Sequence, residues 1–403
     1  MDIREKKPIL VTCGPGLMPY LKAELGALGF EAIDSHPGGV TVKGSLIDCM
    51  KLNLLLRTAY NVLYLLKEFR CGNAETLYKQ VYNLPWDKTI ASDRELSVIT
   101  RANTWAVDNT MYPSLKVKDA IVDKIQNKTG ARPDSGTDRT GVVINLFWKD
   151  DRAWLYLNTS GVKLSDRGYR KMPHMAPLRE SLAAGLLTAA EYDGSQDIVL
   201  PMCGSGTLAI EAALIATNKA PGLLRNSFGL QYINQFDEEI FKQLRNDIRK
   251  QAAKTCTNKI IATDIDPKAI EAAKQNALTA GVDHLIEFGV CDFADTNVPQ
   301  GKGIVMMNPE YGQRLGDTNQ LQKEYKRIGD FFKQKCPGYT GYVFTGNLGL
   351  IGKIGLTASG NKMTFFNGNI KCRLARYELY SGTLKRDEQL VKMGKTNKNP
   401  GIL

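Results

Sequence analysis

The sequence predicts an α/β protein with three folded parts, two small α+β units followed by a doubly wound parallel sheet. Its length supports several parts, because 403 residues exceed one ordinary domain. A hydrophobic content of 43% is enough for well-packed cores. After Gly161 helices and strands begin to alternate, a pattern typical of a parallel sheet with helices on both faces.

The first unit, residues 1–56, starts with the strand PILVTC and an amphipathic helix that ends at Gly29. The strand GVTVKG and the helix SLIDCMKLNLLL follow. The second unit, residues 57–161, is predicted to contain the helix AETLYKQVYNLPW, the strand ELSVITRANTW and a long helix around KVKDAIVDKIQNKTG. Two alternating strands joined by a hairpin turn at KDDR complete it.

The third unit, residues 162–384, opens with the helix LRESLAAGLLTAAEY. The strands QDIVL, NKIIATDID, IEFGVCDF, GIVMMNP and GYTGYVFTGN then alternate with helices. The segment FFNGNIKCRLARYELY is expected to close the sheet with antiparallel strands. Residues 385–403 carry Lys and Arg without periodicity and are expected to form a mobile basic tail.

The composition indicates an acidic partner and gives little support to a metal. A net charge of +11 suits nucleic acid, although a merely soluble basic protein would fit as well. Eight cysteines are scattered singly and three histidines lie far apart, so no metal site or disulfide framework is expected. This cysteine usage fits a reducing cytoplasm. No run of about 18 apolar residues predicts a membrane span.

Ligands of a doubly wound sheet bind beyond the carboxyl ends of its strands, and four such ends carry informative residues. The first end is PMCGSGT, residues 201–207, in which Gly204 and Gly206 let the backbone approach a ligand. The helix that follows supplies free N–H groups. Alone this signal is weak, because glycines in such turns also serve packing. The candidate binding residues in this turn are Pro201, Cys203, Gly204, Gly206 and Thr207.

The next two ends carry carboxylates. Asp264, about 57 residues beyond the glycine turn, suits ribose hydroxyls, although about 20 is usual in dinucleotide sites. The segment NKAPGLLRNSFGLQYINQFDEE is therefore expected to be an insertion. Asp266 could serve instead, or could cap the helix that begins at Pro267. Asp292 could accept a hydrogen bond from an adenine amino group, or could be an ordinary loop aspartate.

The fourth end is MMNPEYGQRL, residues 306–315. Asn308, Pro309, Glu310 and Tyr311 place an amide, a carboxylate and an aromatic ring at the tip of an apolar strand. The alternative is a strand end followed by a simple turn.

In this order the four ends resemble class I S-adenosylmethionine-dependent methyltransferases. Further segments are similar to the bacterial THUMP-containing RNA methyltransferases over residues 1 to about 384. These segments are RANTWAVDNTMYPSLKVKDAIVDKI, DRGYRKMPHMAPLRESLAAGLL, PMCGSGTLAIEAALIA and NGNIKCRLARYELY. The resemblance implies a Rossmann-like class I methyltransferase domain behind a ferredoxin-like domain and a THUMP domain. It also implies S-adenosyl-L-methionine as cofactor and structured RNA as partner, with guanine N2 of large-subunit (23S) ribosomal RNA as the expected target.

The resemblance assigns roles to the fourth end. The Asn308 side chain and the Pro309 carbonyl would accept hydrogen bonds from the target amine, and Asn308 also borders the cofactor. Tyr311 would stack on an extruded base. Glu310 replaces the second proline of the family's N-P-P-Y, and it could accept from guanine N1–H or N2–H or point away. No metal is needed, since the sulfonium already activates the methyl group.

A second departure lies at Leu200, where the family has an Asp that helps to hold the cofactor's amino-acid end. Glu180, in APLRE, could take over that role. Two alternatives to the expected function stay open. The enzyme could methylate another exocyclic amine, in tRNA guanine or at adenine N6. The chain could also be a non-catalytic RNA-binding or ribosome-assembly factor.

Aromatic and basic residues outside the strand ends give weaker signals. The four tryptophans, Trp86, Trp105, Trp148 and Trp154, lie in apolar segments and are expected in the core. Arg132, in the loop ARPDSGTDR, is the better candidate for an RNA contact.

Overall fold

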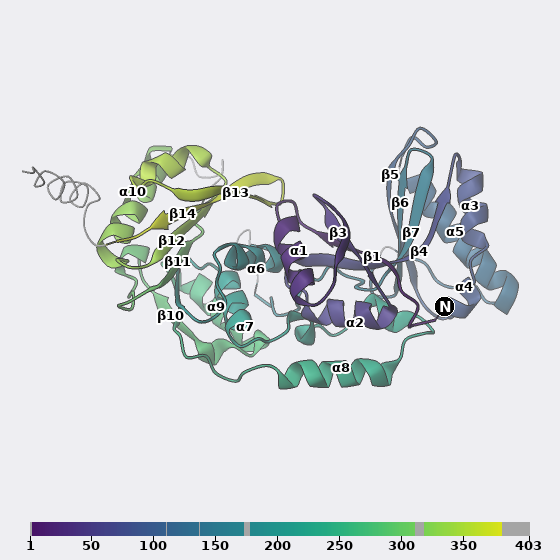
Figure 1. The fold of residues 1–403 in the computed structure, drawn as a ribbon, viewed down its shortest axis with the longest axis horizontal. Helices are drawn as coiled ribbons and strands as arrows, with labels where there is room; N and C mark the ends of the chain where they lie inside the picture. Colours follow the sequence, from purple (N-terminus) through teal and green to yellow (C-terminus); the bar gives the residue numbers. More distant parts are fainter. Residues whose placement is uncertain (1, 110, 137, 173–177, 311–317, 381–403) are drawn as a thin grey trace, which may run out of the picture.

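The structure, a computed structural model, describes residues 2–380 apart from 110, 137, 173–177 and 311–317. Tyr311 and the expected tail, residues 385–403, therefore lie outside the described residues. Two seven-stranded sheets form the framework. The first occupies the middle and right of Figure 1, and the second occupies the left.

One continuous sheet runs through both N-terminal units, in the order β2-β3-β1-β4-β7-β6-β5. Its strands are β1 (Lys7–Cys13), β2 (Ala32–His36), β3 (Gly39–Gly44), β4 (Ala59–Arg70), β5 (Leu96–Asn103), β6 (Val142–Lys149) and β7 (Arg152–Asn158). β4 pairs with β1 on one side and with β7 on the other, so it joins the two units. Neither β2 nor β4 was predicted from the sequence. β4 was missed because its apolar residues form a continuous run and do not alternate.

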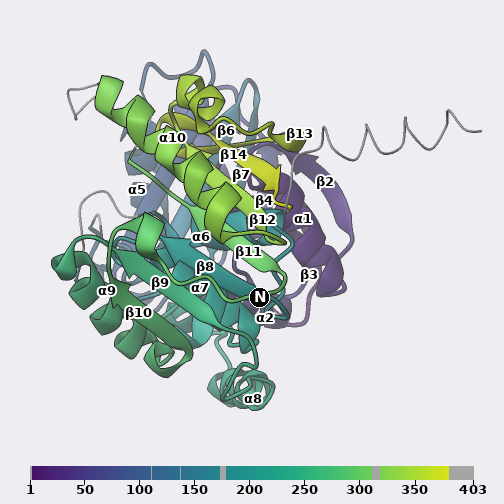
Figure 2. The ribbon, with the colours of Figure 1, turned by 90° about the vertical axis from the view of Figure 1, so that its left-hand side faces the viewer.

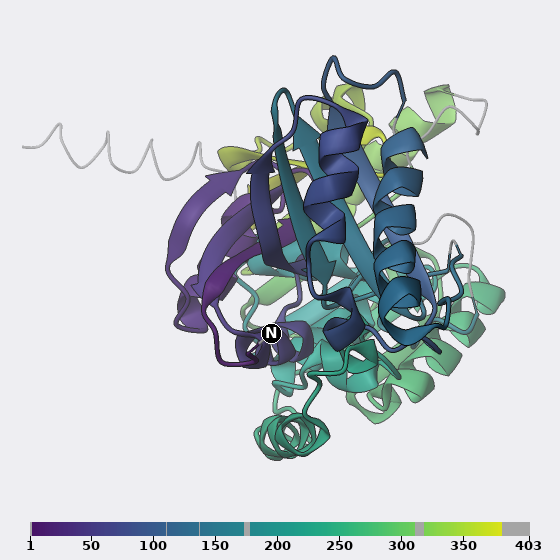
Figure 3. The same cartoon turned by 90° about the vertical axis from the view of Figure 1, so that its right-hand side faces the viewer.

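Helices cover this sheet. They are α1 (Met18–Ala27), α2 (Leu46–Leu55), α3 (Ala74–Tyr82), α4 (Trp86–Thr89) and α5 (Met111–Thr129). α3 and α5 lie together over the half of the sheet that ends at β5 (Figure 3). Trp86 and Trp148 are buried in the core, as expected, and Trp154 is half-buried. The expectation for Trp105 is wrong, because β5 ends at Asn103 and leaves Trp105 in the following turn, 71% exposed.

The second sheet has the order β10-β9-β8-β11-β12-β14-β13. Its strands are β8 (Asp197–Pro201), β9 (Ile260–Asp264), β10 (Ile286–Val290), β11 (Gly303–Met307), β12 (Thr340–Thr345), β13 (Ser359–Asn367) and β14 (Ile370–Glu378). The first five strands in that order pair in parallel. β14 pairs antiparallel with β12, and β13 pairs antiparallel with β14. β8 and β11 are neighbours in this sheet. From β8 the chain adds β9 and β10 on one side, and it then crosses over to add β11 and β12 on the other side.

The second sheet is covered on both faces. The helices of this domain are α6 (Glu180–Ala189), α7 (Thr207–Ala216), α8 (Glu238–Lys250), α9 (Pro267–Ala280) and α10 (Thr318–Lys335), of which α8 packs against α2 of the first domain. In β8, Ile198 and Leu200 enter one core, while Val199 enters a second core that contains Ile328 of α10. Because both faces are buried at the centre of the sheet, β8 and β11 are almost entirely apolar. Figure 2 shows α10 crossing one side of the sheet, with α9 near the other.

The segment between α7 and β9 is the expected insertion, and it docks against the first sheet's domain. It contains the 3-10 helix η1 (Pro221–Leu224), the 3-10 helix η2 (Gly229–Tyr232) and α8, which was not predicted. A Cβ added to Gly222 would lie 2.5 Å from the Leu54 Cα of α2. This close backbone approach gives the long spacing before Asp264 a structural reason.

Candidate functional site

The candidate site lies where the order of the second sheet reverses. β8 ends at Pro201, and the neighbouring strand β11 ends at Met307, directly before Asn308. The two strands pair in parallel with Val199 opposite Val305. Their carboxyl ends therefore open on the same edge, at the switch point where doubly wound sheets bind ligands.

The two glycines of the turn after β8 have different structural reasons. Gly206 has a φ of 81°, and a Cβ there would lie 2.8 Å from the Ala273 Cβ of α9. Gly206 therefore permits close packing of two helices. Gly204 also has a positive φ, 54°, but a Cβ there would meet no atom within 4 Å. Gly204 therefore faces open space, as a position that a ligand approaches should.

The other members of the turn are held firmly. Cys203 N–H donates to the Thr263 carbonyl of β9, at 3.0 Å. Burial raises the pKa of the Cys203 thiol well above its usual range, so the thiol stays protonated at neutral pH. Thr207 is buried and begins α7, directly after Gly206. Cys203 therefore helps to fix the shape of the turn and is not suited to act as a nucleophile.

Asp264 ties the glycine turn to the end of β9. Its Oδ2 accepts from Gly204 N–H at 2.9 Å, and its Oδ1 accepts from Asp266 N–H at 3.0 Å. Each carboxylate oxygen keeps a further lone pair for a ligand hydroxyl. Asp266 is the N-cap of α9 and accepts from Lys268 N–H at 2.9 Å. The capping alternative for Asp266 is thus present in the structure.

Asp292 follows β10 and is anchored to α10. Its Oδ1 accepts from Ala294 N–H at 2.9 Å and from the Arg327 guanidinium at 2.7 Å. Burial alone would raise the pKa of Asp292, but these two donors lower it below its usual value. Arg327 also lies 4.7 Å from the Phe293 ring centroid. The arrangement keeps Asp292 ionised and leaves Oδ2 outside both bonds.

Asn308 carries the most informative atom of the site. Its Oδ1 is buried, and no donor reaches it within the described residues. Pro309 is buried and Glu310 is exposed. Burial, and then the negative charge of Glu310, raise the pKa of the Glu324 carboxyl, so Glu310 and Glu324 face the same region. The strand tip therefore offers an amide acceptor without a partner beside a negatively charged surface.

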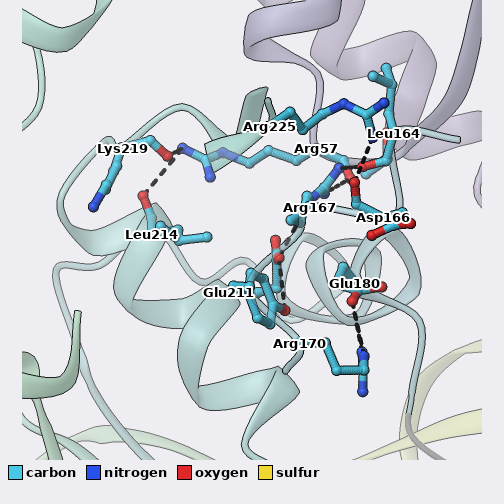
Figure 4. A network of polar contacts seen from close by, with 12 residues as sticks. Arg57, Leu164, Asp166, Arg167, Arg170, Glu180, Glu211, Leu214, Lys219 and Arg225 are labelled. Carbon is cyan, nitrogen blue, oxygen red and sulfur yellow. Dashed lines mark hydrogen bonds and ion pairs between the residues drawn. The ribbon is translucent and has the colours of Figure 1, made fainter. Parts of the chain in front are cut away.

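Glu180 lies at the start of α6 and is paired. Its Oε1 accepts from the Arg170 guanidinium at 2.8 Å and 3.1 Å (Figure 4). Burial raises the pKa of Glu180, and Arg170 opposes that rise. Arg170 also reaches the Ser205 Oγ of the glycine turn at 3.5 Å. Leu200 is fully buried in the core. Glu180 is thus connected to the glycine turn through Arg170. A cationic ligand at Glu180 would have to share the carboxylate with Arg170.

Three family models match the chain. The RMKL-like methyltransferase domain matches residues 167–376, the RlmL ferredoxin-like domain matches 8–63 and the THUMP domain matches 71–158. The chain belongs to the RMKL-like methyltransferase family. The expected α/β fold class, with its ferredoxin-like, THUMP and methyltransferase domains, is confirmed. The gap between the first two matched ranges, residues 64–70, is the last part of β4, which pairs with β1 on the ferredoxin-like side and with β7 on the THUMP side.

Relatives of this methyltransferase family align over nearly the whole chain. The "Ribosomal RNA large subunit methyltransferase K/L" of Psychromonas ingrahamii is 35% identical over 95% of this chain, but only 52% of its own length is covered. The chain thus spans about half the length of such relatives. A "Putative RNA methyltransferase" of Synechocystis is 32% identical over 93% of this chain and 97% of its own. The solved structure of SMU.472, titled as a putative methyltransferase complexed with SAH, has a TM-score of 0.83 and 26% identity. The match covers 95% of this chain and all of that one.

Several residues of this methyltransferase site were not found from the sequence. Arg170 contacts Glu180 and Ser205, Arg327 contacts Asp292, and Glu324 faces Glu310. Arg170 and Ser205 lie within segments that carry the resemblance, whereas Glu324 and Arg327 do not. Among the described residues, no group of three or more His, Cys, Asp or Glu could hold a metal ion. No helix within the described part of the chain is long and apolar enough to cross a membrane.

Proposed function

We propose that this methyltransferase binds S-adenosyl-L-methionine across the ends of β8, β9 and β10 and methylates N2 of a guanine in large-subunit ribosomal RNA. The Asn308 Oδ1 at the switch point, which has no hydrogen-bond donor among the described residues, supports this proposal most strongly. A buried acceptor without a donor costs about 1–3 kcal/mol, and an incoming amine would satisfy it. The K/L name of the relatives and the SAH in the SMU.472 structure support the target and the cofactor.

The residues around the turn fit such a cofactor. Open space at Gly204 would admit the ligand to the backbone, and the spare lone pairs of Asp264 would accept from ribose hydroxyls. The free Oδ2 of Asp292 would accept from the adenine amino group. S-adenosylmethionine would supply a methyl group that its sulfonium has already activated.

The target amine would be held by the tip of β11. Asn308 Oδ1 and the Pro309 carbonyl would accept its two N–H groups, which orients the nitrogen lone pair toward the methyl group. The nitrogen would form a bond to the methyl carbon as the carbon–sulfur bond breaks, which leaves the thioether S-adenosylhomocysteine, and the nitrogen would lose one proton to water. Tyr311 is proposed to stack on the base. Glu310 would accept from guanine N1–H, whereas adenine presents a lone pair at N1, so this carboxylate favours guanine.

Two measurements test the proposal. Calorimetric titration should show S-adenosylmethionine binding, which a non-catalytic RNA-binding factor would lack. Purified protein should then transfer labelled methyl groups to large-subunit RNA taken from a strain without the gene, and nucleoside mass analysis should find N2-methylguanosine. Labelled N6-methyladenosine, or label in tRNA alone, would contradict the proposed target and leave the cofactor assignment in place.

A further inference from the structure

Four cations lie at the junction of the THUMP domain, the linker and the catalytic domain. Arg101 is on β5, Arg139 is in the loop before β6, Lys163 is in the linker after β7, and Arg179 directly precedes α6. We name these four residues the junction cluster. Lys163 Nζ lies 4.9 Å from the ring centroid of Tyr60, and the Arg179 guanidinium carbon lies 5.9 Å from it.

The junction cluster rests on backbone that is closely packed. A Cβ on Gly14 would lie 2.7 Å from the Tyr60 hydroxyl, so the Tyr60 ring is held against the turn after β1. A Cβ on Gly161 would lie 3.0 Å from the Arg139 carbonyl, which places the Arg139 backbone against the start of the linker. Arg139, Lys163 and Arg179, three of the four members, are therefore held on a fixed support.

No negative charge balances the junction cluster within the described residues. Burial lowers the pKa of Lys163, and then Arg179, Arg139 and Arg101 lower it further, without an opposing carboxylate. None of the four forms an ion pair with a carboxylate in the described part of the chain. Gathered like charges repel one another, so an anion that binds there is stabilised.

The junction cluster also adjoins the candidate catalytic site. Arg179 is next to Glu180, and Arg170 links the Glu180 carboxylate to Ser205 in the glycine turn. Arg101 and Arg139 come from the THUMP domain and are exposed. An anion that touches all four residues must therefore extend from the THUMP domain toward the catalytic domain, which a nucleic acid backbone does and a single small phosphate does not.

We propose that the junction cluster binds consecutive backbone phosphates of the RNA substrate and holds that strand between the THUMP domain and the catalytic domain. The identity of the polyanion as RNA rests on the proposed function. Phosphate contacts of this kind set position and register and carry no sequence information. Target choice would therefore remain with the residues at the tip of β11.

The test compares RNA binding by the full chain and by cluster variants. A fluorescently labelled RNA hairpin from large-subunit RNA is titrated at salt concentrations from about 50 to 400 mM, and anisotropy gives the dissociation constant. Lys163→Gln and Arg179→Gln should each reduce the slope of log affinity against log salt by about 0.7–0.9, with additive effects in the double variant. At 0.1 M salt each should weaken binding about five- to eightfold relative to the parent.

A matched control removes one Lys and one Arg elsewhere. Arg249→Gln with Lys254→Gln changes exposed positions at and beyond the end of α8, and this double variant should keep the parent's slope. Melting temperature verifies folding, and Lys163→Gln should not lower it because it removes an unbalanced charge. A cluster variant with the parent's slope, or an equal loss in the control, would overturn the proposal. Reduced slopes in a protein that binds no S-adenosylmethionine would instead contradict the proposed catalytic function alone.

Discussion

The Oδ1 atom of Asn308 is buried and has no hydrogen-bond donor among the described residues. Replacing Asn308 should therefore affect activity without lowering stability. The residue should act on the target amine and not on the cofactor. We expect Asn308→Ala to lower methyl transfer by at least about 100-fold, since a positioning contact in the transition state is lost. S-adenosylmethionine affinity should stay within about threefold.

Stability gives this prediction a second readout. Because Asn308 Oδ1 has no donor among the described residues, its removal should not lower the denaturant midpoint. Radiolabelled transfer, calorimetry and urea titration of the same preparation measure the three quantities. Equal losses of cofactor affinity and of transfer would contradict the proposed role.

Glu180 gives a prediction about pH. If its carboxylate holds the cofactor's ammonium group beside Arg170, Glu180→Gln should weaken binding by roughly 1.5–3 kcal/mol. The ionised form is the one that binds a cation, and burial raises the pKa of Glu180. As pH falls, affinity should therefore decline at a pH above the ordinary glutamate value of about 4.3.

The Glu180→Gln variant is also the control for that pH profile. It should lose the parent's decline in affinity with falling pH, as calorimetry at each pH would show. A variant that binds as tightly as the parent would mean that Glu180 serves only to orient Arg170. The buried position of Leu200 makes the family's Asp a poor rescue there, since a carboxylate would enter the core.

At the scale of elements, the parallel sheet could be predicted because each of its strands is a short apolar run between helices. β4 could not, since a register shift between Leu65 and Lys67 disrupts its alternation. α8 was missed although Ile240, Phe241, Leu244 and Ile248 follow the cap at Asp237 with helical spacing. The positions of Asp264 and Asp292 could be predicted because both carboxylates lie at or just after the ends of strands.

Their partners could not be derived in the same way. Arg327 reaches Asp292 from a helix 35 residues away, and only tertiary packing sets that distance. Similarly, nothing local in the sequence shows that the Asn308 amide oxygen finds no donor within the described part of the chain. Sequence therefore located the candidate groups, and the fold supplied their charges and hydrogen bonds.

The glycine turn allows two substitutions of the same size to be compared. Gly206→Ala would drive a methyl group into Ala273 of α9 and should destabilise the fold by about 2–3 kcal/mol. Gly204→Ala meets open space and should cost only about 1 kcal/mol, from its positive φ. Gly204→Ala should nevertheless weaken S-adenosylmethionine binding at least about tenfold, because the ligand would occupy that space. Urea titration and calorimetry of both variants provide the comparison, and unchanged cofactor binding in Gly204→Ala would show that the ligand lies elsewhere.

At the scale of the whole molecule, polar contacts fasten the ferredoxin-like domain to α7, the helix that begins at the glycine turn. Arg57 donates to the carbonyls of Leu214 and Lys219, at 3.2 Å and 3.0 Å, and Arg167 donates to the Arg57 carbonyl (Figure 4). Arg167 also pairs with Glu211 of α7 at 3.5 Å, and both side chains are almost fully buried. The ferredoxin-like and methyltransferase domains are therefore held together by buried charges.

This arrangement predicts a strong coupling between Arg167 and Glu211. Glu211→Leu alone should cost about 3–5 kcal/mol, because it leaves the Arg167 charge buried without its partner. Arg167→Met with Glu211→Leu should recover part of that loss, since apolar replacements of a buried pair are often tolerated. Urea midpoints of the parent, both single variants and the double variant form the cycle that measures the coupling. Additive losses would show that the two charges act independently and that the domain contact depends on the Arg57 hydrogen bonds instead.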